Sequence, residues 1–249
     1  MTNTLTGKTA LVTGATAGIG YSIARQLAAE GAAVIVHGRN AERGAKVVQE
    51  IQNTGGTARF IAADVSDVTD VRRLADEAGA VDILVNNAGI YRFAPTFDTT
   101  DADFDDQINT NLRAPYVLVQ KLVPGMVARG HGTVINVTTV AATVPAEGAG
   151  IYGASKAALE LLNALWADEF GSQGVRVNAV APGPTQTPGT LVFEDGLIEG
   201  LGKTTALGRT GEADEIANVV TFLASPAASY VNGTVVTVGG GYRAIHPAA

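Results

Sequence analysis

The stretch Thr9-Ala10-Leu11-Val12-Thr13-Gly14-Ala15-Thr16-Ala17-Gly18-Ile19-Gly20 decides the fold of this chain. Its first four residues suit a buried strand, and a helical pattern follows Gly20. The glycines between them let the chain turn sharply and let backbone N–H groups approach a pyrophosphate at the helix N-terminus. The spacing is one residue looser than the common dinucleotide fingerprint, so an ordinary glycine-rich turn remains the alternative. The residues predicted to bind a dinucleotide here are Gly14, Thr16, Gly18, Ile19 and Gly20.

Short β-branched runs alternate with longer helical patterns along the rest of the chain. The predicted strands are Thr9–Val12, Val34–His37, Ala58–Ala62, Ile83–Asn86, Thr133–Thr138, Arg176–Ala179 and Thr234–Val238. The predicted helices cover residues 18–30, 41–53, 67–78, 101–128, 153–171 and 212–224. Such alternation implies right-handed crossovers between parallel strands. We therefore predict an α/β fold of the doubly wound, Rossmann-like kind, a seven-stranded parallel sheet with helices on both faces.

Length and composition fit one folded domain. The chain has 249 residues, enough to bury a substantial core without disulfides or metals. No linker, repeat or low-complexity tract divides it, so we predict a single domain over residues 1–249. A loop as long as 183–210 in a compact domain is usually functional, and we predict a substrate lid at 184–207. The segments expected to border the substrate are Ile90–Phe97, Val140–Ile151 and the lid, including its residues Leu191, Val192 and Phe193.

Composition argues against several classes of function. The chain has no cysteine, which rules out disulfides and thiol chemistry, and its three histidines (His37, His131, His246) lack metal-ligand spacing. A net charge of −7 with intermixed signs argues against a nucleic-acid partner. An anionic cofactor stays compatible with this charge, because backbone dipoles can hold phosphates. The chain has no 18-residue apolar run and no apolar signal-peptide core near Met1, so we expect a cytoplasmic protein without a membrane partner.

The end of the second predicted strand, Val36-His37-Gly38-Arg39-Asn40, bears on the choice of cofactor. An acidic residue in this segment would bind the ribose 2′-OH of NAD, and none is present. Gly38 leaves space, and Arg39 can form a charge-assisted contact to a 2′-phosphate, which favours NADP over NAD. Ala17 argues against NADP, because a second basic residue at that position would strengthen the prediction of a 2′-phosphate contact. The alternative for Arg39 is a solvated charge in a loop.

Further candidates stand at the ends of the third and fourth predicted strands. Asp64 and Val65 follow the third strand, where Asp64 can meet an adenine amino group. Asn87, Ala88 and Gly89 close the fourth, where small residues permit close approach to a cofactor. Because ligands of open α/β sheets bind beyond the carboxyl ends of the strands, we expect these residues to share one crevice.

Tyr152 and Lys156 stand four residues apart before an apolar helical pattern, so both side chains lie on one helix face. A free tyrosine has a pKa of about 10, and a lysine cation one turn away favours the phenolate and lowers that pKa. The pair is therefore a candidate proton donor with its own tuning charge. The spacing alone arises often by chance, so a surface pair remains the alternative.

Together these motifs carry a family resemblance. The shared pieces are Thr13-Gly14-x-x-x-Gly18-x-Gly20, Asn86-Asn87-Ala88-Gly89, Asn111, Tyr152-x-x-x-Lys156 and Pro182-Gly183. In order and spacing the chain resembles the short-chain dehydrogenase/reductase family over nearly its whole length, and it is most similar to the single-domain reductases that include the β-ketoacyl-acyl-carrier-protein reductases. The resemblance implies an enzyme that transfers a hydride between NADP(H) and a carbonyl or secondary alcohol, with ketone reduction as the expected direction.

The resemblance also implies residue roles. Tyr152 would be the general acid, and Lys156 would lower its pKa and hydrogen-bond the nicotinamide ribose. Asn111 would hold a water that links Lys156 to solvent, with a structural asparagine at a helix kink as the alternative. Thr139 stands where the family usually has serine; it would bind the substrate oxygen and narrow the substrate range, with a plain strand residue as the alternative.

The remaining expectations concern the cofactor, the substrate and assembly. The residues that complete the predicted cofactor set are Pro182, Gly183, Thr185 and Thr187, the last at the family's carboxamide position. The bordering side chains are mixed and largely apolar, so a modest-sized ketone or its alcohol is the expected substrate. The resemblance implies a homotetramer or a dimer, in which the apolar surfaces of the predicted helices 101–128 and 153–171 pair between subunits. The alternative is that all of this apolar surface packs on the sheet. A catalytically weak dinucleotide-binding sensor or scaffold is the second functional hypothesis; a sugar-nucleotide epimerase is disfavoured, because such relatives run much longer.

Overall fold

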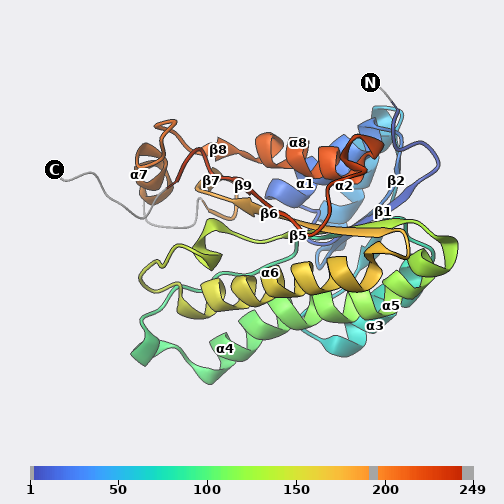
Figure 1. Cartoon of the computed structure of the whole chain (residues 1–249). Helices are drawn as coiled ribbons and strands as arrows, with labels where there is room; N and C mark the ends of the chain where they lie inside the picture. The colour runs from blue at the N-terminus through green and yellow to red at the C-terminus, as the bar shows by residue number, and fades with distance from the viewer. Residues whose placement is uncertain (1–2, 191–195, 243–249) are drawn as a thin grey trace.

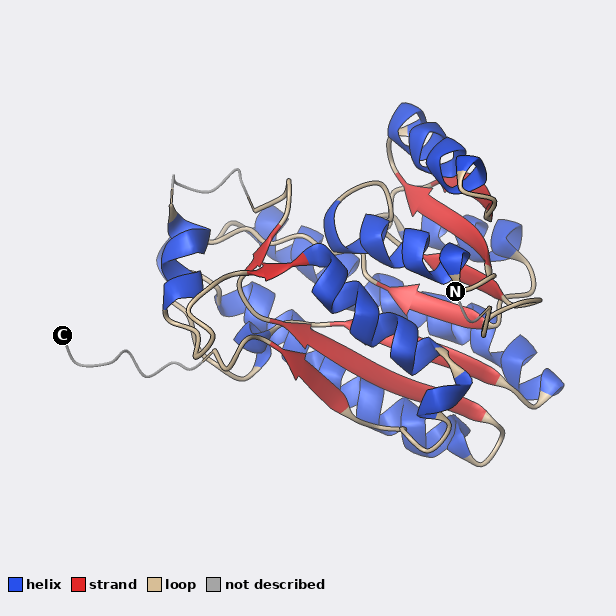
Figure 2. Cartoon of the chain, turned by 90° about the horizontal axis from the view of Figure 1, so that it is seen from above, coloured by secondary structure: helices blue, strands red, loops and turns tan. Residues whose placement is uncertain are grey.

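A twisted parallel sheet of seven strands forms the centre of the molecule, described here by a computed structural model for residues 3–190 and 196–242 (Figures 1 and 2). Its strands are β1 (Thr9–Val12), β2 (Ala33–Gly38), β3 (Thr57–Ala62), β4 (Ile83–Asn86), β5 (Gly132–Val137), β6 (Val175–Pro182) and β9 (Val235–Val238). They lie in the order β3-β2-β1-β4-β5-β6-β9, and each neighbouring pair is parallel. The strand order reverses between β1 and β4, which is where such sheets place their ligand crevice.

Helices cover both faces of the sheet, as Figure 1 shows. One layer contains α1 (Gly18–Ala29), α2 (Ala41–Asn53) and α8 (Ala213–Ala224), and the opposite layer contains α3 (Val68–Ala78), α4 (Asp101–Ile108), α5 (Ala114–Arg129) and α6 (Gly150–Gly171). Each layer seals its own apolar core, one including Ile23, Val47 and Val220 and the other Leu74, Leu118 and Leu159. The predicted fold class is confirmed.

The strands divide their side chains between these two cores. In β1, Ala10 and Val12 belong to the core under α1 and α8, whereas Leu11 belongs to the core under α3, α5 and α6. In β4, Val85 and Leu84 divide in the same way. Successive strand residues point to opposite faces, so a strand covered on both sides must be apolar at every position. This requirement explains the unbroken apolar runs 10–12 in β1 and 83–85 in β4.

The predicted helix over residues 101–128 is interrupted in the structure. A π-helical segment, η2 (Asn109–Arg113), separates α4 from α5. Such single π turns occur frequently at functional sites. In this one the side chain of Asn111 is directed to the loop after β4, where its Oδ1 accepts a hydrogen bond from Ile90 N at 2.9 Å. A helix kink at Asn111 was one of the alternatives predicted from the sequence, and the interruption includes that residue.

The predicted irregular region 183–210 contains more order than expected. The short strand β7 (Thr185–Gln186) pairs in parallel with β8 (Gly211–Glu212), and α7 (Leu197–Lys203) lies between them in the chain. Single turns of 3₁₀ helix occur elsewhere, at η1 (Thr96–Asp98), η3 (Val140–Ala142) and η4 (Pro226–Ala228). Leu191, Val192 and Phe193, which were expected to border the substrate, lie outside the described residues.

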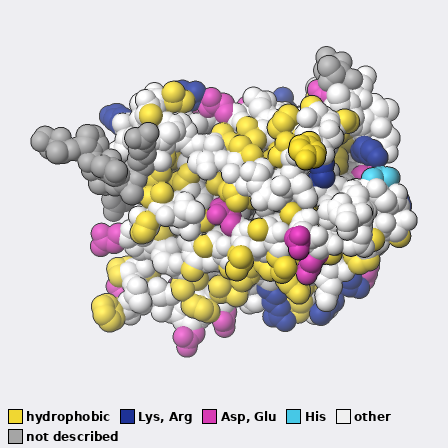
Figure 3. Space-filling model, viewed as in Figure 1, with side chains coloured by type: hydrophobic (Ala, Val, Ile, Leu, Met, Phe, Trp, Pro, Cys, Tyr) yellow, Lys and Arg dark blue, Asp and Glu magenta, His cyan; other side chains and the backbone are white. Residues whose placement is uncertain are grey.

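The apolar surface of α5 and α6 packs mostly on the sheet, but a part of it faces outward. Leu161 is 74% exposed and Leu165 47% exposed, and apolar side chains gather over this part of the molecule in Figure 3. Subunit pairing through these helices stays a prediction. In the part of the chain that the structure describes, no helix has the length and apolar character needed to cross a membrane.

Candidate active site

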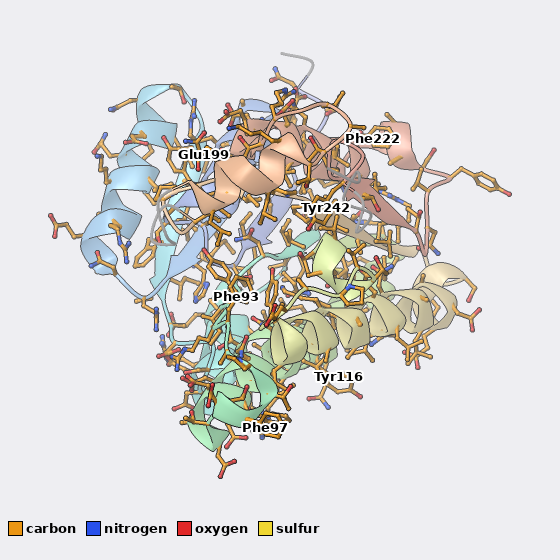
Figure 4. All side chains as sticks on the ribbon, turned by 90° about the vertical axis from the view of Figure 1, so that its left-hand side faces the viewer. Phe93, Phe97, Tyr116, Glu199, Phe222 and Tyr242 are labelled. Carbon is orange, nitrogen blue, oxygen red and sulfur yellow. The ribbon has the colours of Figure 1, made fainter. Side chains whose placement is uncertain are left out.

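A cavity of about 650 Å³ lies at the carboxyl edge of the sheet. Figure 4 looks onto this side of the molecule, with Phe93 near the middle and α7 and Tyr242 above it. The predicted cofactor residues all line the cavity: Gly14, Thr16, Gly18, Ile19, Gly20, Arg39, Asp64, Val65, Asn87, Ala88, Gly89, Tyr152, Lys156, Pro182, Gly183, Thr185 and Thr187. Thr139 lines it as well, whereas Asn111 does not. Residues that follow the carboxyl ends of β1, β2, β3, β4 and β6 thus meet in one cavity with Tyr152 and Lys156 of α6.

The turn between β1 and α1 is shaped so that only glycine fits at its key positions. Gly14 and Gly18 have φ angles of +64° and +56°, which L side chains rarely adopt. A Cβ on Gly20 would lie 2.4 Å from both Gly14 O and Asn87 Nδ2. The N-cap of α1, Ala17, forms no side-chain hydrogen bond with the first N–H groups of the helix. These groups and the helix dipole form an anion site of the kind that holds a pyrophosphate, so the residues present fit a dinucleotide.

The residue pair Thr13 and Asn87 locks this turn to the end of β4. Thr13 Oγ1 accepts hydrogen bonds from the backbone N–H groups of Asn87 and Ala88, both at 2.9 Å. The Asn87 side chain in turn donates to Thr13 O at 2.8 Å. Asn87 was predicted as a cofactor residue because small neighbours permit close approach. Its side chain also holds the phosphate turn in place.

Two arginines line the cavity beyond the carboxyl end of β2, of which the sequence pattern identified only Arg39. The second, Arg43, stands in the first turn of α2, and its backbone N–H donates to the N-cap side chain Asn40 at 2.8 Å. Neither arginine takes part in an ion pair within the described ranges. The helix-capping residue Asn40, three residues before Arg43, was the available sequence signal for Arg43.

One carboxylate oxygen of Asp64 accepts hydrogen bonds from the turn that follows it. Its Oδ1 accepts from Ser66 N at 3.0 Å and from Ser66 Oγ at 2.9 Å, and its backbone N–H donates to Asp70 Oδ2 at 2.7 Å. These bonds fix the loop after β3 against the cavity. The contact with an adenine amino group stays a prediction.

His37 is a site residue that sequence reasoning missed. Its ring is 1% exposed, its Nδ1 accepts from Gly14 N at 3.1 Å, and its Nε2 lies 3.1 Å from Ala63 O. The neutral ring with a proton on Nε2 satisfies both contacts, so the histidine joins the phosphate turn to the end of β3. Burial lowers its pKa to about 4. The sequence feature that indicated a site role for His37 was its place at the end of the second strand, which lies beside the turn between β1 and α1.

Three of the predicted catalytic residues, Tyr152, Thr139 and Lys156, line the same cavity. Tyr152 is hydrogen-bonded to the side chain of Thr139, which is 9% exposed. Thr139 Oγ1 also accepts from Ala141 N at 3.2 Å, which caps η3 and orients the hydroxyl. Lys156 is 3% exposed, and its Nζ donates to Val137 O at 2.9 Å. A surface role for the tyrosine–lysine pair is thereby excluded.

The predicted lowering of the tyrosine pKa is wrong for this structure. Burial raises the pKa of Tyr152 to about 12, and the hydrogen bond from Thr139 opposes this only in part. Lys156 does not supply the expected correction, since burial lowers its own pKa to about 8. Desolvation disfavours both the phenolate and the ammonium. At neutral pH the tyrosine is therefore a protonated donor.

Asn111 lies directly behind these groups rather than in the cavity. It is fully buried, and its Nδ2 donates to Ile90 O at 2.9 Å and to Ser155 Oγ at 3.1 Å. A Cβ on Gly89 would lie 3.3 Å from both Asn111 Oδ1 and Lys156 Nζ. The asparagine therefore has a structural role at the π turn, as one of the two hypotheses held. The water relay stays a prediction.

The sheet, the phosphate turn and the tyrosine–lysine pair define the class of dinucleotide-dependent oxidoreductases. A family model described as enoyl-(acyl carrier protein) reductase matches residues 14–243. The chain therefore belongs to the short-chain dehydrogenase/reductase family, as its motifs predicted, and this family comprises oxidoreductases of alcohol and carbonyl groups.

Three comparisons describe its relatives. The chain is 40% identical over 239 residues to the 3-oxoacyl-(acyl-carrier-protein) reductase FabG of Staphylococcus aureus, a match that covers 94% of this chain and 97% of the relative. A solved short chain dehydrogenase/reductase family protein is 51% identical with a TM-score of 0.91, covering 97% of this chain and 100% of that one. A gluconate 5-dehydrogenase from Burkholderia cenocepacia, solved in complex with NADP and tartrate, is 35% identical with a TM-score of 0.91 and covers 98% of each chain.

Proposed function

We propose that this protein is an NADPH-dependent reductase of small ketones, with Tyr152 as the general acid. The observation that carries the proposal is the convergence of a protonated, partly buried tyrosine with the Thr139 hydroxyl in the same cavity that the predicted cofactor residues line. Arg39 and Arg43, which also line it, support NADP over NAD, as does the NADP bound to the similar gluconate 5-dehydrogenase.

The residues divide the chemistry between binding the carbonyl oxygen and moving a proton. A carbonyl oxygen beside Tyr152 and Thr139 accepts a hydrogen bond from each hydroxyl, which stabilises the negative charge that develops there. When bound, NADPH supplies the hydride for the carbonyl carbon. Tyr152 gives its proton to the oxygen and regains one from solvent. The Lys156 side chain, which its bond to Val137 O holds in place, would hydrogen-bond the nicotinamide ribose.

The identity of the nicotinamide cofactor depends on the two arginines. We expect Arg39→Gln and Arg43→Gln each to weaken NADPH binding by about tenfold, because a charge-assisted hydrogen bond to a phosphate contributes roughly that much. NADH binding should change far less in both variants. Titration calorimetry with each cofactor measures both effects, with Arg72→Gln, an exposed arginine of α3 outside the cavity, as the matched control. Equal losses for NADPH and NADH would contradict the 2′-phosphate role.

Thr139 provides the direct test of the proposed reductase. With NADPH and a small ketone, we expect Thr139→Ala to lower kcat by about 100-fold, the usual effect of removing one donor to a developing oxyanion. Thr139→Ser keeps the hydroxyl and should retain most of the activity while accepting a wider range of ketones. The loss of NADPH absorbance at 340 nm measures all three proteins. An unchanged rate in Thr139→Ala would remove Thr139 from the mechanism, and no turnover by the wild type on any ketone would favour the sensor hypothesis.

A further inference from the structure

Two aromatic side chains form a flat wall beside the catalytic tyrosine. The rings of Tyr91 and Phe93 stack with centroids 6.2 Å apart and an interplanar angle of 28°. Both stand edge-to-face against Tyr152, each with a centroid separation of 6.0 Å and an angle of 75°. Both line the cavity, and Phe93, labelled near the middle of Figure 4, is 47% exposed. The hydroxyl of Tyr91 reaches the segment after β7, where a Cβ on Gly189 would lie 2.5 Å from it.

The backbone under this wall is held by two amide side chains from the helical layer. Asn111 pairs with both the N–H and the C=O of Ile90, each at 2.9 Å. Gln107 does the same for Arg92, at 3.3 and 3.4 Å. The loop is also tied to the opposite rim of the cavity, because Ala94 N donates to Gly148 O at 2.9 Å. A wall held at three points keeps its orientation when a substrate binds, and a fixed wall can select a substrate by shape.

The charge near the wall disfavours an anionic substrate. Arg92 lines the cavity, but its guanidinium forms ion pairs with two carboxylates, Asp103 and Asp106. The cluster therefore carries one net negative charge, and Asp106 itself lines the cavity. The other side chains around this end that the structure describes are mainly apolar: Val144, Ala146, Ala149, Ile198 and Leu201.

We propose that the site selects neutral ketones with a flat, aromatic substituent on the carbonyl carbon. This inference rests on the proposed function and specifies its substrate class. A carbonyl oxygen bonded to Tyr152 and Thr139 places one substituent against the Tyr91–Phe93 wall, where aromatic contact is favourable. A carboxylate on that substituent would approach the net negative cluster around Arg92 and be rejected. The reaction is balanced as ketone plus NADPH plus one proton giving secondary alcohol plus NADP⁺, with the proton delivered by Tyr152.

The test compares four probes with saturating NADPH: acetophenone, its 4-carboxylate, 5-ketogluconate and the N-acetylcysteamine thioester of acetoacetate. We expect kcat/KM for acetophenone to exceed that for the 4-carboxylate by at least about tenfold, and to exceed those for the other two probes. A preference for the carboxylate, the polyhydroxy acid or the thioester would overturn the inference while leaving the reductase function standing. Failure to reduce any probe would overturn the proposed function itself.

Variants show whether the wall and the cluster cause the preference. Phe93→Ala should lower kcat/KM for acetophenone by about fivefold relative to that for butanone, because butanone has no ring to place on the wall. Phe222→Ala, which removes an exposed phenylalanine of α8 outside the cavity, is the matched control and should leave that ratio unchanged. Asp106→Asn should raise the 4-carboxylate-to-acetophenone ratio by about threefold or more. Unchanged ratios in both Phe93→Ala and Asp106→Asn would refute the assignment.

Discussion

Replacement of Tyr152 by phenylalanine is expected to lower kcat for NADPH-dependent ketone reduction by about 1000-fold, the middle of the range for loss of a general acid. The substitution keeps the ring that packs edge-to-face on Tyr91 and Phe93 and removes only the hydroxyl. Binding of NADPH should therefore stay within about threefold of the wild-type value, since the phosphate turn and the arginines are untouched. Steady-state kinetics and cofactor titration on the same preparation separate these two effects.

The protonation state of Tyr152 at neutral pH predicts which direction of the reaction is faster. With a pKa of about 12, the hydroxyl is protonated at neutral pH and is ready to donate, whereas a base would have to lose that proton first. Reduction should thus be faster than alcohol oxidation at pH 7. Tyr116→Phe, which removes the hydroxyl of an exposed tyrosine packed on Trp166, is the matched control and should behave as wild type. If Tyr152→Phe retained more than about a tenth of the wild-type kcat, another group would be the acid.

Local sequence pattern predicted the elements that two-sided burial dictates. The strands Thr9–Val12 and Ile83–Asn86 and the helix over 41–53 were predicted with the observed bounds, and the other strands of the sheet differ by a few residues at their ends. The π turn at Asn109–Arg113 was not predictable from apolar periodicity, because the residues that it buries, Thr110 and Asn111, are polar. It depends instead on long-range hydrogen bonds, from Asn111 to Ile90 and Ser155.

The site residues that follow the carboxyl ends of strands were predictable from the sequence. Parallel strands place their carboxyl ends along one edge, so Asp64 and Asn87, which follow different strands, could be assigned to one cavity, and both line it. The pKa values of Tyr152 and Lys156 were not predictable from the spacing of the two residues in the sequence. A separation of four residues places Lys156 near Tyr152, but it does not reveal that both groups are desolvated, and desolvation dominates the pKa of each.

His37 shows the same limit, because only the packed structure gives it a role. One nitrogen accepts from the backbone of the phosphate turn and the other donates to Ala63 O. A second proton would remove the acceptor that Gly14 N requires, which leaves a charged ring and an unpaired N–H in the interior. Nearby Asp64 and Asp70 favour the protonated ring, but burial outweighs them.

We therefore expect the free energy of unfolding to fall by about 3 kcal/mol on account of His37 alone as the pH drops from 7 to 4. The unfolded chain binds a proton at this histidine with a pKa of 6.5, whereas the folded chain binds it only near 4. Since the unfolded state holds more protons between these values, acid shifts the equilibrium toward unfolding, and the contribution is fully present only above 6.5.

Urea unfolding followed by circular dichroism at pH 7.0, 5.5 and 4.5 measures this contribution, with His37→Asn as the comparison. Asparagine can keep an acceptor for Gly14 N but has no group that titrates in this range, so its stability should be lower at pH 7 and fall less on acidification. The gap between the two proteins should narrow by about 2 kcal/mol at pH 4.5, because most of the wild-type loss has then occurred. Parallel stability curves would show that the buried ring does not titrate as its contacts require, and that the acid sensitivity belongs to the carboxylates.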